Sequence, residues 1–207
     1  MRDQDSIQRF LFEEVDIRGG IVHLNFSLTR ILEQHQYPKM IEQLLAQTLA
    51  ASVLLTASLK FKGQMTIQFY GEGAINMLVA KCDHLFHIRA LAHFDETALD
   101  SDVADSFGNG KLVVTIQSDD KGKSYQSIIP IVNNSISESL QHYFAQSEQI
   151  STRIWLCHTN HAASGMLLQL MPATPSQIRE QFWEHAVKLG ETITNHELVN
   201  LDNLTIL

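Results

Sequence analysis

The segment from Leu44 to Leu59, LLAQTLAASVLLTASL, is apolar around most of a helical circumference. Pro38 precedes it at a position that suits the first turn of a helix, so we expect one long helix from Pro38 to about Phe61. A helix that is apolar on nearly every side has to be covered on several sides by other elements. This segment therefore predicts a central, buried helix around which the rest of the chain is packed.

Alternating apolar and polar residues on both sides of this helix predict antiparallel strands. The alternation from Phe10 to Phe26, interrupted at Gly19 and Gly20, predicts one hairpin. A second hairpin is predicted around the turn at Gly71 to Gly73. Further strands are expected at residues 88–94, at 112–131 on either side of a DDKGK turn (119–123), at 153–157 and at 165–170. The predicted fold class is α+β, with antiparallel β-sheets packed around a long buried helix.

Several hydroxyl residues stand where the first turn of a helix would need a cap. They predict a short helix after Ser27, a helix after Ser135 with Glu138 as its partner, a helix opened by Thr174, Pro175 and Gln177 that ends at Gly190, and a last short helix opened by Thr194 with Glu197. The last two belong to a C-terminal amphipathic region. We expect a core domain over residues 1–172 followed by a helical linker region over residues 173–207.

The charge balance and the termini restrict the kind of partner that the chain can have. It carries 15 Lys and Arg against 23 Asp and Glu, a formal net charge of −8. Phosphate backbones are bound by clustered cations, which this sequence lacks, so nucleic acid is not an expected partner. Met1 to Ser6 is polar, and no apolar run approaches the ~20 residues that span a bilayer. With only two cysteines, the sequence indicates a reducing, cytoplasmic location and no membrane partner.

No catalytic motif is complete, so no catalytic residue is predicted. The stretch from Gly71 to Asn76 has two of the three glycines of a dinucleotide-binding loop. The sequence around Gly108 to Lys111 lacks the first glycine and the hydroxyl residue of a phosphate-binding loop. Ser164 has no glycine in the position that a nucleophile elbow requires on its N-terminal side.

Two local groups combine a cysteine with two histidines: Cys82 with His84 and His87, and Cys157 with His158 and His161. In a strand, His87 would point away from the face that Cys82 and His84 share, and the second group has no fourth ligand nearby. We therefore predict no metal site and two buried thiols. Neither cysteine belongs to a CxxC pair, so neither is a redox switch by itself.

The C-terminal region carries large apolar residues, among them Phe182, Trp183, Leu198 and Leu201. The plainest interpretation is a helical layer that covers the preceding domain. Full burial of one such side chain stabilises by only ~1.5–3 kcal/mol, so a short two-helix layer could detach at modest cost. These four residues are therefore candidates for a conditional cover over apolar surface.

Three segments are shared with a known family: Leu54 to Gly63 (LLTASLKFKG), Tyr143 to Gln149 (YFAQSEQ) and Gly165 to Pro172 (GMLLQLMP). Together with Arg18 and Gly19 in the first hairpin, they resemble the heat shock protein 33 family of redox-regulated holdase chaperones. The likeness extends over essentially the whole chain in the same order. The chain differs at three turn positions, where the family commonly has proline or glycine: Ala74, Ser151 and Ser164.

This resemblance implies an ATP-independent chaperone that binds unfolding proteins, prevents their aggregation under oxidative or heat stress, and acts as a homodimer. Our own hypothesis is that Phe182, Trp183, Leu198 and Leu201 in the C-terminal cover contribute to client binding or to its regulation. Members of the family continue into a zinc module with four cysteines in CxC and CxxC spacing, which nothing in this sequence matches. We expect no cofactor here, zinc only where that module is present, and a chain that is a fragment comprising core and linker.

The residues leave three alternatives open. A regulatory module would bind one partner through a rigid interface. An enzyme would use a cleft between the sheet and the linker helices and would show converging titratable groups. An atypical metalloprotein would bind a stoichiometric metal ion.

Overall fold

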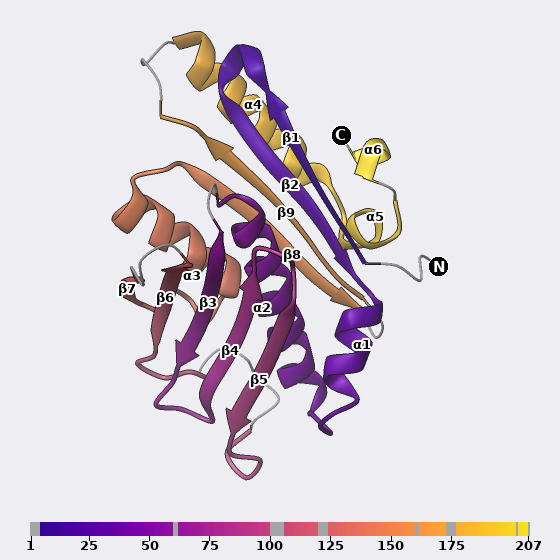
Figure 1. The fold of residues 1–207 in the computed structure, drawn as a ribbon, viewed down its shortest axis with the longest axis vertical. Coiled ribbons are helices and arrows are strands. Elements are labelled where there is room, and N and C mark those ends of the chain that lie inside the picture. The colour runs from indigo at the N-terminus through magenta and orange to yellow at the C-terminus, as the bar shows by residue number, and fades with distance from the viewer. Residues whose placement is uncertain are drawn as a thin grey trace.

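The computed structural model describes residues 5–59, 62–99, 106–119, 124–159, 162–172, 177–201 and 203–206. Two antiparallel sheets enclose helix α2 (Lys39–Ala57), and the C-terminal helices lie on the other side of one of these sheets (Figure 1). This arrangement confirms the predicted α+β class with a long buried helix at its centre.

Helix α2 is buried along its whole second half, from Thr48 to Ala57. Hydroxyl groups fit into this apolar environment because they donate to backbone carbonyls of the same helix: Thr48 to Leu44 and Ser52 to Leu49, each at 2.7 Å. Among the described helices, α2 alone is long and apolar enough to cross a membrane, but 78% of that window is buried inside the protein. It is therefore a core helix.

The expected end of α2 at Phe61 is too late. The helix ends at Ala57, and Ser58 closes it by donating its hydroxyl to the carbonyl of Leu55 at 2.7 Å. Lys60 and Phe61 lie outside the described residues. Leu59, just beyond the helix, still packs against the main core, so apolar composition alone could not mark the end of the helix.

The four-stranded sheet has the order β1 (Ser6–Phe12), β2 (Ile17–Leu24), β9 (Ala162–Leu170) and β8 (Thr152–Thr159). The predicted first hairpin is confirmed, but the sequence placed its turn wrongly. The turn is the short helix η1 (Glu13–Val15) with Asp16 in a left-handed conformation, whereas Gly19 and Gly20 lie inside β2. A Cβ atom at Gly19 would come within 2.2 Å of the ring of Phe10, so this glycine provides space for an aromatic ring rather than a turn.

The five-stranded sheet has the order β5 (Ile88–Phe94), β4 (Ile75–Asp83), β3 (Gly63–Tyr70), β6 (Lys111–Ser118) and β7 (Ser124–Pro130). The predicted hairpin around Gly71 to Gly73 connects β3 and β4, and β6 pairs with β7 as expected. Residues 120–123 of the predicted DDKGK turn lie outside the described residues. One face of this sheet packs on α2, so α2 lies between the two sheets.

Helix α1 (Phe26–Leu32) differs from the prediction in its cap residue, and α3 (Ile136–Tyr143) differs only in the partner of Glu138. Helix α1 begins after Asn25, not after Ser27, and the carboxylate of Asp5 accepts from the backbone N–H groups of both residues. Helix α3 begins at Ser135 as predicted, with the turn η3 (Phe144–Glu148) behind it. The carboxylate of Glu138 accepts from the side chain of Asn133, so this cap is not reciprocal.

Helices α4 (Gln177–Thr192), α5 (Asn195–Asn200) and α6 (Asn203–Ile206) follow the last strand. The predicted capping box of Thr194 and Glu197 is present in both directions. Gly190 does not end α4: a Cβ atom there would lie 2.7 Å from the ring of Trp155, so this glycine lets the helix approach the sheet. Residues 173–176, which include the predicted cap residues Thr174 and Pro175, lie outside the described residues.

Candidate functional site

The four-stranded sheet is apolar on both faces. Strand β9 is buried from Ala162 to Gln169 without alternation, a pattern that requires cover on both sides. Leu167 faces α2, whereas its neighbours Met166 and Leu168 face the opposite side, which we call the outer face. Figure 1 shows α4 running along this side of β1, β2 and β9, with α5 and α6 beyond its C-terminal end. The C-terminal helices are therefore a cover over an apolar sheet face.

The outer face holds two small apolar clusters. The first lies beneath α5 and centres on Ile21, Cys157, Met166 and Leu198. The second lies beneath α4 and centres on Val15, Ile17 and Leu168, against which Trp183 and Ala186 pack. The partly buried rings of Phe10 and Trp155 contact both clusters and so connect them.

The structure separates the four predicted cover residues into three kinds. Leu198 is 3% exposed, and Trp183 packs on the second cluster, so both hold the cover to the sheet. Phe182 is 50% exposed and lies at the edge of a cavity. Leu201 is half-buried directly after α5, where its backbone N–H donates to the carbonyl of Glu197 at 2.9 Å.

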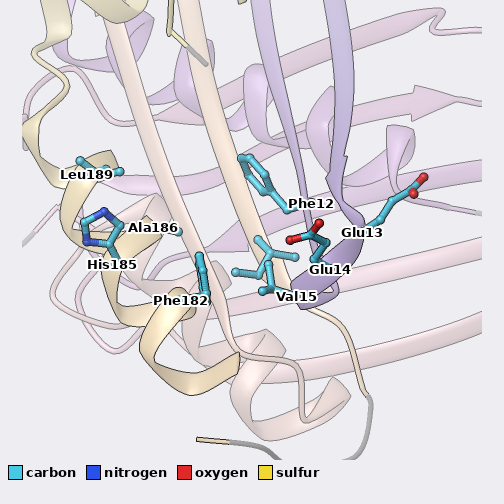
Figure 2. Close-up of a pocket in the computed structure, with 9 residues that line it drawn as sticks. Phe12, Glu13, Glu14, Val15, Phe182, His185, Ala186 and Leu189 are labelled. Atoms are coloured by element: carbon cyan, nitrogen blue, oxygen red, sulfur yellow. The ribbon is translucent and has the colours of Figure 1, made fainter. Parts of the chain in front are cut away.

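Helix α4 is loosely packed against the outer face. Only Val187 and Gly190 of its 16 residues are buried. A cavity of about 440 Å³ separates α4 from the end of the first hairpin, and Figure 2 shows Phe182 and Leu189 of α4 facing Phe12 and Val15 across it. A second cavity of about 360 Å³ shares Phe12, Ala186 and Leu189 with the first. The two cavities are therefore adjacent, and we call them together the α4 groove.

An ion pair at α4 and a capping box at α5 are two polar interactions of the cover. Arg179 of α4 approaches Asp16 of the hairpin turn at 3.7 Å, and the carboxylate of Asp16 is half exposed, which makes the pair weak. In the capping box of α5, the backbone N–H and the hydroxyl of Thr194 donate to Glu197 at 2.9 and 2.8 Å. These hydrogen bonds lower the pKa of the Glu197 carboxyl below its usual value. The cap defines where α5 begins but adds little contact with the sheet.

The two cysteines occupy different parts of the molecule. Cys82 belongs to the main core, while the thiol of Cys157 lies on the outer face, 3.9 Å from the carbonyl of Asn195 in α5. Burial raises the pKa of each thiol to about 11, which favours the neutral form. Because the two thiols belong to separate clusters, they cannot be ligands of one zinc ion together. Within the described residues, no three His, Cys, Asp or Glu side chains are grouped so that they could hold a metal ion.

Arg18, one of the residues on which the family resemblance rests, has a structural position. Its guanidinium donates twice to the side chain of Gln169, at 2.9 and 2.7 Å, and reaches the carbonyl of Ser58 at 3.5 Å. Arg9 donates to the carbonyl of Ala57 at 3.3 Å. Cations are favourable at the C-terminal end of a helix, so the two arginines fasten the end of α2 to the four-stranded sheet.

Sequence reasoning missed the sheet side of this site. The outer face is formed by Phe10, Phe12, Trp155, Met166 and Leu168 as much as by the C-terminal helices. Two signals were available: the unbroken apolar run of β9, which is typical of a strand covered on both faces, and the spacing of Phe10 and Phe12, which puts both rings on one face. The two rings are in edge-to-face contact, with their centroids 5.5 Å apart.

Comparison with known proteins agrees with this architecture. The family model described as Hsp33 protein matches residues 5–207. The chain belongs to the Hsp33 family. Hsp33 proteins are redox-regulated chaperones rather than enzymes, so the enzyme alternative is not supported. The predicted family and its chaperone function are confirmed.

Individual relatives give the same result. The 33 kDa chaperonin of Pseudomonas savastanoi is 40% identical over 210 residues, which cover 99% of this chain and 70% of the relative. The 33 kDa chaperonin of Methylobacillus flagellatus is 38% identical over 208 residues, which cover 100% of this chain and 71% of the relative. The crystal structure of the 33 kDa chaperonin from Thermotoga maritima superimposes with a TM-score of 0.83 at 22% identity, over 97% of this chain and 72% of that one, and supports the fold. This Hsp33 chain thus spans about 70% of the length of its relatives.

Proposed function

We propose that this Hsp33 chain captures unfolding proteins, without ATP, on the outer face of its four-stranded sheet and in the α4 groove. The observation that carries the proposal is an apolar sheet face covered by a helix of which only Val187 and Gly190 are buried. Non-native proteins expose apolar segments, and exposed apolar surface of this kind is where such segments bind. Client proteins under oxidative or heat stress are the partners that this surface fits.

The cover is proposed to detach in part while the core stays folded. Each well-buried apolar side chain stabilises by about 1.5–3 kcal/mol, and α4 and α5 together bury few of them, chiefly Val187 and Leu198. Local opening of such an element costs less than global unfolding. Opening would join the α4 groove to the cluster beneath α5 and enlarge the apolar surface.

Several finer expectations remain part of the proposal. We propose residues 1–172 as the chaperone core and residues 173–207 as the linker that carries the cover, with Phe182, Trp183, Leu198 and Leu201 as its client-binding or regulatory residues. We propose a homodimer in the cytoplasm, for which light scattering of the purified chain is the direct measurement. Zinc is proposed only for a chain that includes the four-cysteine module of the family, because the two thiols present here lie in separate clusters.

The two cysteines allow cover opening to be measured directly. Cys157 lies beneath α5 and Cys82 lies in the main core, so opening of the cover should expose only Cys157 to a thiol reagent. We expect labelling of Cys157 to be faster than that of Cys82 and to increase with temperature before the core unfolds. Equal rates for both thiols would mean that no separate opening exists.

Aggregation of a chemically unfolded client provides the functional readout. The double substitution Phe182→Ser with Trp183→Ser should weaken suppression of aggregation or change the labelling rate of Cys157. The matched control is Tyr125→Ser with Ile128→Ser on β7, which removes two apolar side chains of 47% and 60% exposure away from the cover. Suppression that is equal in wild type and both variants, with unchanged labelling of Cys157, would contradict the assignment.

Client range distinguishes a holdase from a regulatory binding module. A holdase that recognises apolar surface should protect several unrelated clients with similar efficiency, because the hydrophobic effect is not directional. Protection of one client alone would favour the regulatory module.

A further inference from the structure

The α4 groove has an acidic side. Glu13 and Glu14 of the hairpin turn line its larger cavity, opposite Phe182 and Leu189 of α4. Of the described residues that line this cavity, none is a lysine or an arginine. The nearby Arg179 of α4 has its own carboxylate in Asp16, at 3.7 Å. The cavity therefore combines apolar walls with glutamates on the hairpin side and the imidazole of His185 on the α4 side.

The two glutamates differ in direction. Figure 2 shows the carboxylate of Glu14 turned toward the space between η1 and α4, while Glu13 extends away from it. Both residues belong to η1, which begins directly after Phe12. A cation placed next to an apolar group in the cavity would meet the carboxylate of Glu14 first.

We propose that the α4 groove selects client segments in which a large apolar side chain stands next to lysine or arginine. The apolar side chain would occupy the cavity, whose volume of about 440 Å³ is within the range of about 300–1,000 Å³ that is usual for ligand sites. The neighbouring cation would face Glu14. This inference rests on the proposed function and names the class of client segment that the surface prefers.

The preference follows from complementarity of charge. Unlike charges across an interface favour one partner over another more than they raise affinity in general. With a formal net charge of −8 the whole chain attracts cations, so a local effect has to be separated from a general one. Two variants separate the local effect from the general one. One neutralises a carboxylate at the groove and the other neutralises a carboxylate far from it, so the net charge changes equally in both.

The test uses the full 207-residue chain and three labelled peptides with the same apolar centre, Leu-Phe-Leu, flanked by lysines, glutamines or glutamates. Fluorescence anisotropy gives the three affinities. We expect the lysine-flanked peptide to bind about two- to fivefold more tightly than the glutamine-flanked one, and the glutamate-flanked one to bind weakest. Raising the salt from about 0.02 M to about 0.5 M should bring the ratios toward one, because exposed charges are screened.

Three variants locate the effect. Glu14→Gln should lower the lysine-to-glutamine affinity ratio toward one, whereas Glu72→Gln, an exposed carboxylate in the turn between β3 and β4, should leave it unchanged. Leu189→Ser, at a residue that is 55% exposed, should weaken all three peptides by a similar factor. Equal unfolding midpoints in urea for Glu14→Gln and Glu72→Gln would show that both variants are folded.

The results separate this inference from the proposed function. Equal affinity of the three peptides for a chain that still suppresses aggregation would overturn the charge preference and leave the holdase function standing. Equal loss of the ratio in Glu14→Gln and Glu72→Gln would also overturn it, because the preference would then come from net charge. A chain that neither suppresses aggregation nor binds any peptide would contradict the proposed function itself.

Discussion

The two faces of the four-stranded sheet are built from the same strands but are covered in opposite ways. On the inner face, α2 contributes an unbroken buried stretch from Thr48 to Ala57 and joins one cluster that includes the second sheet. On the outer face, α4 buries Val187 and Gly190 and leaves two cavities beside it. The inner face is therefore the more tightly packed one, and we propose that a small structural change exposes the apolar surface of the outer face.

The composition of the two helices explains this difference. Helix α2 is apolar around its circumference and can be packed from both sides. Helix α4 carries Glu180, Glu184, Lys188 and Glu191 in an exposed position, so only a narrow stripe faces the sheet. A helix of this kind gains little from docking, so we expect its detachment to leave the main core intact.

The largest expected effect is on the inner face. Leu49→Ala removes a side chain that is 0% exposed at the centre of α2 and should lower the free energy of unfolding by about 2–5 kcal/mol, because the cavity cannot collapse between two sheets. Urea unfolding followed by circular dichroism measures this loss. A decrease below about 1 kcal/mol would show that the centre of α2 is less tightly packed than its burial indicates.

The same kind of deletion on the outer face should act locally. Leu198→Ala removes a side chain that is 3% exposed beneath α5 and should weaken docking of the cover by about 2 kcal/mol. Labelling of Cys157 should then become about tenfold faster or more, while labelling of Cys82 stays unchanged. Faster labelling of both thiols would mean that the two faces unfold together.

Loss of the helix cap should have a smaller effect on the cover. Thr194→Ala removes the side-chain acceptor for the backbone N–H of Glu197 and should weaken α5 by about 1 kcal/mol. Thr194→Ser keeps a hydroxyl acceptor and is the matched control. The labelling rate of Cys157 should increase about fivefold in Thr194→Ala and little in Thr194→Ser, and equal rates would show that the cap does not limit opening.

Acidification should produce the smallest effect. The pKa of Glu197 is lowered in the folded protein by hydrogen bonds from Thr194, from an ordinary value of 4.5. The ionised Glu197 therefore stabilises docked α5 fully above about pH 4.5, and this stabilisation is lost as the pH falls through the lowered pKa of Glu197. Hydrogen exchange of the α5 amides, corrected for the intrinsic rate, should show less protection below this pH. Glu197→Gln should reduce the pH dependence of this protection. A pH profile identical to that of the wild type would count against this role of Glu197.

Local signals in the sequence predicted much of the fold. The alternation in β3 and β4, the turn at Gly71 to Gly73 and the caps at Ser135 and Thr194 depend on neighbouring residues, and the structure confirms them. The cap of α1 depends on Asp5, about 20 residues away, and was assigned to Ser27 instead. Gly19 and Gly190 were interpreted as breaks, although each one makes room for an aromatic ring from another strand.

The sequence predicted the helical cover of the candidate site but not the sheet residues and the groove beneath it. The amphipathic C-terminal helices indicated a cover, and Trp183 and Leu198 do lie on the sheet. The α4 groove was not predicted, because it arises where the hairpin turn at Glu13 to Val15 meets a helix more than 160 residues later in the chain. The contact between the hairpin turn and α4 also decides which cover residues pack on the sheet and which, like Phe182, stay exposed to solvent.

The sequence by itself determined the central helix, the positions of most strands along the chain and the presence of an amphipathic C-terminal layer, because periodicity and caps act over a few residues. The tertiary structure alone decided which face of the four-stranded sheet is tightly packed and which is loosely covered. Packing density depends on the side chains that meet from distant parts of the chain, and no local pattern specifies how well they fill the space between them.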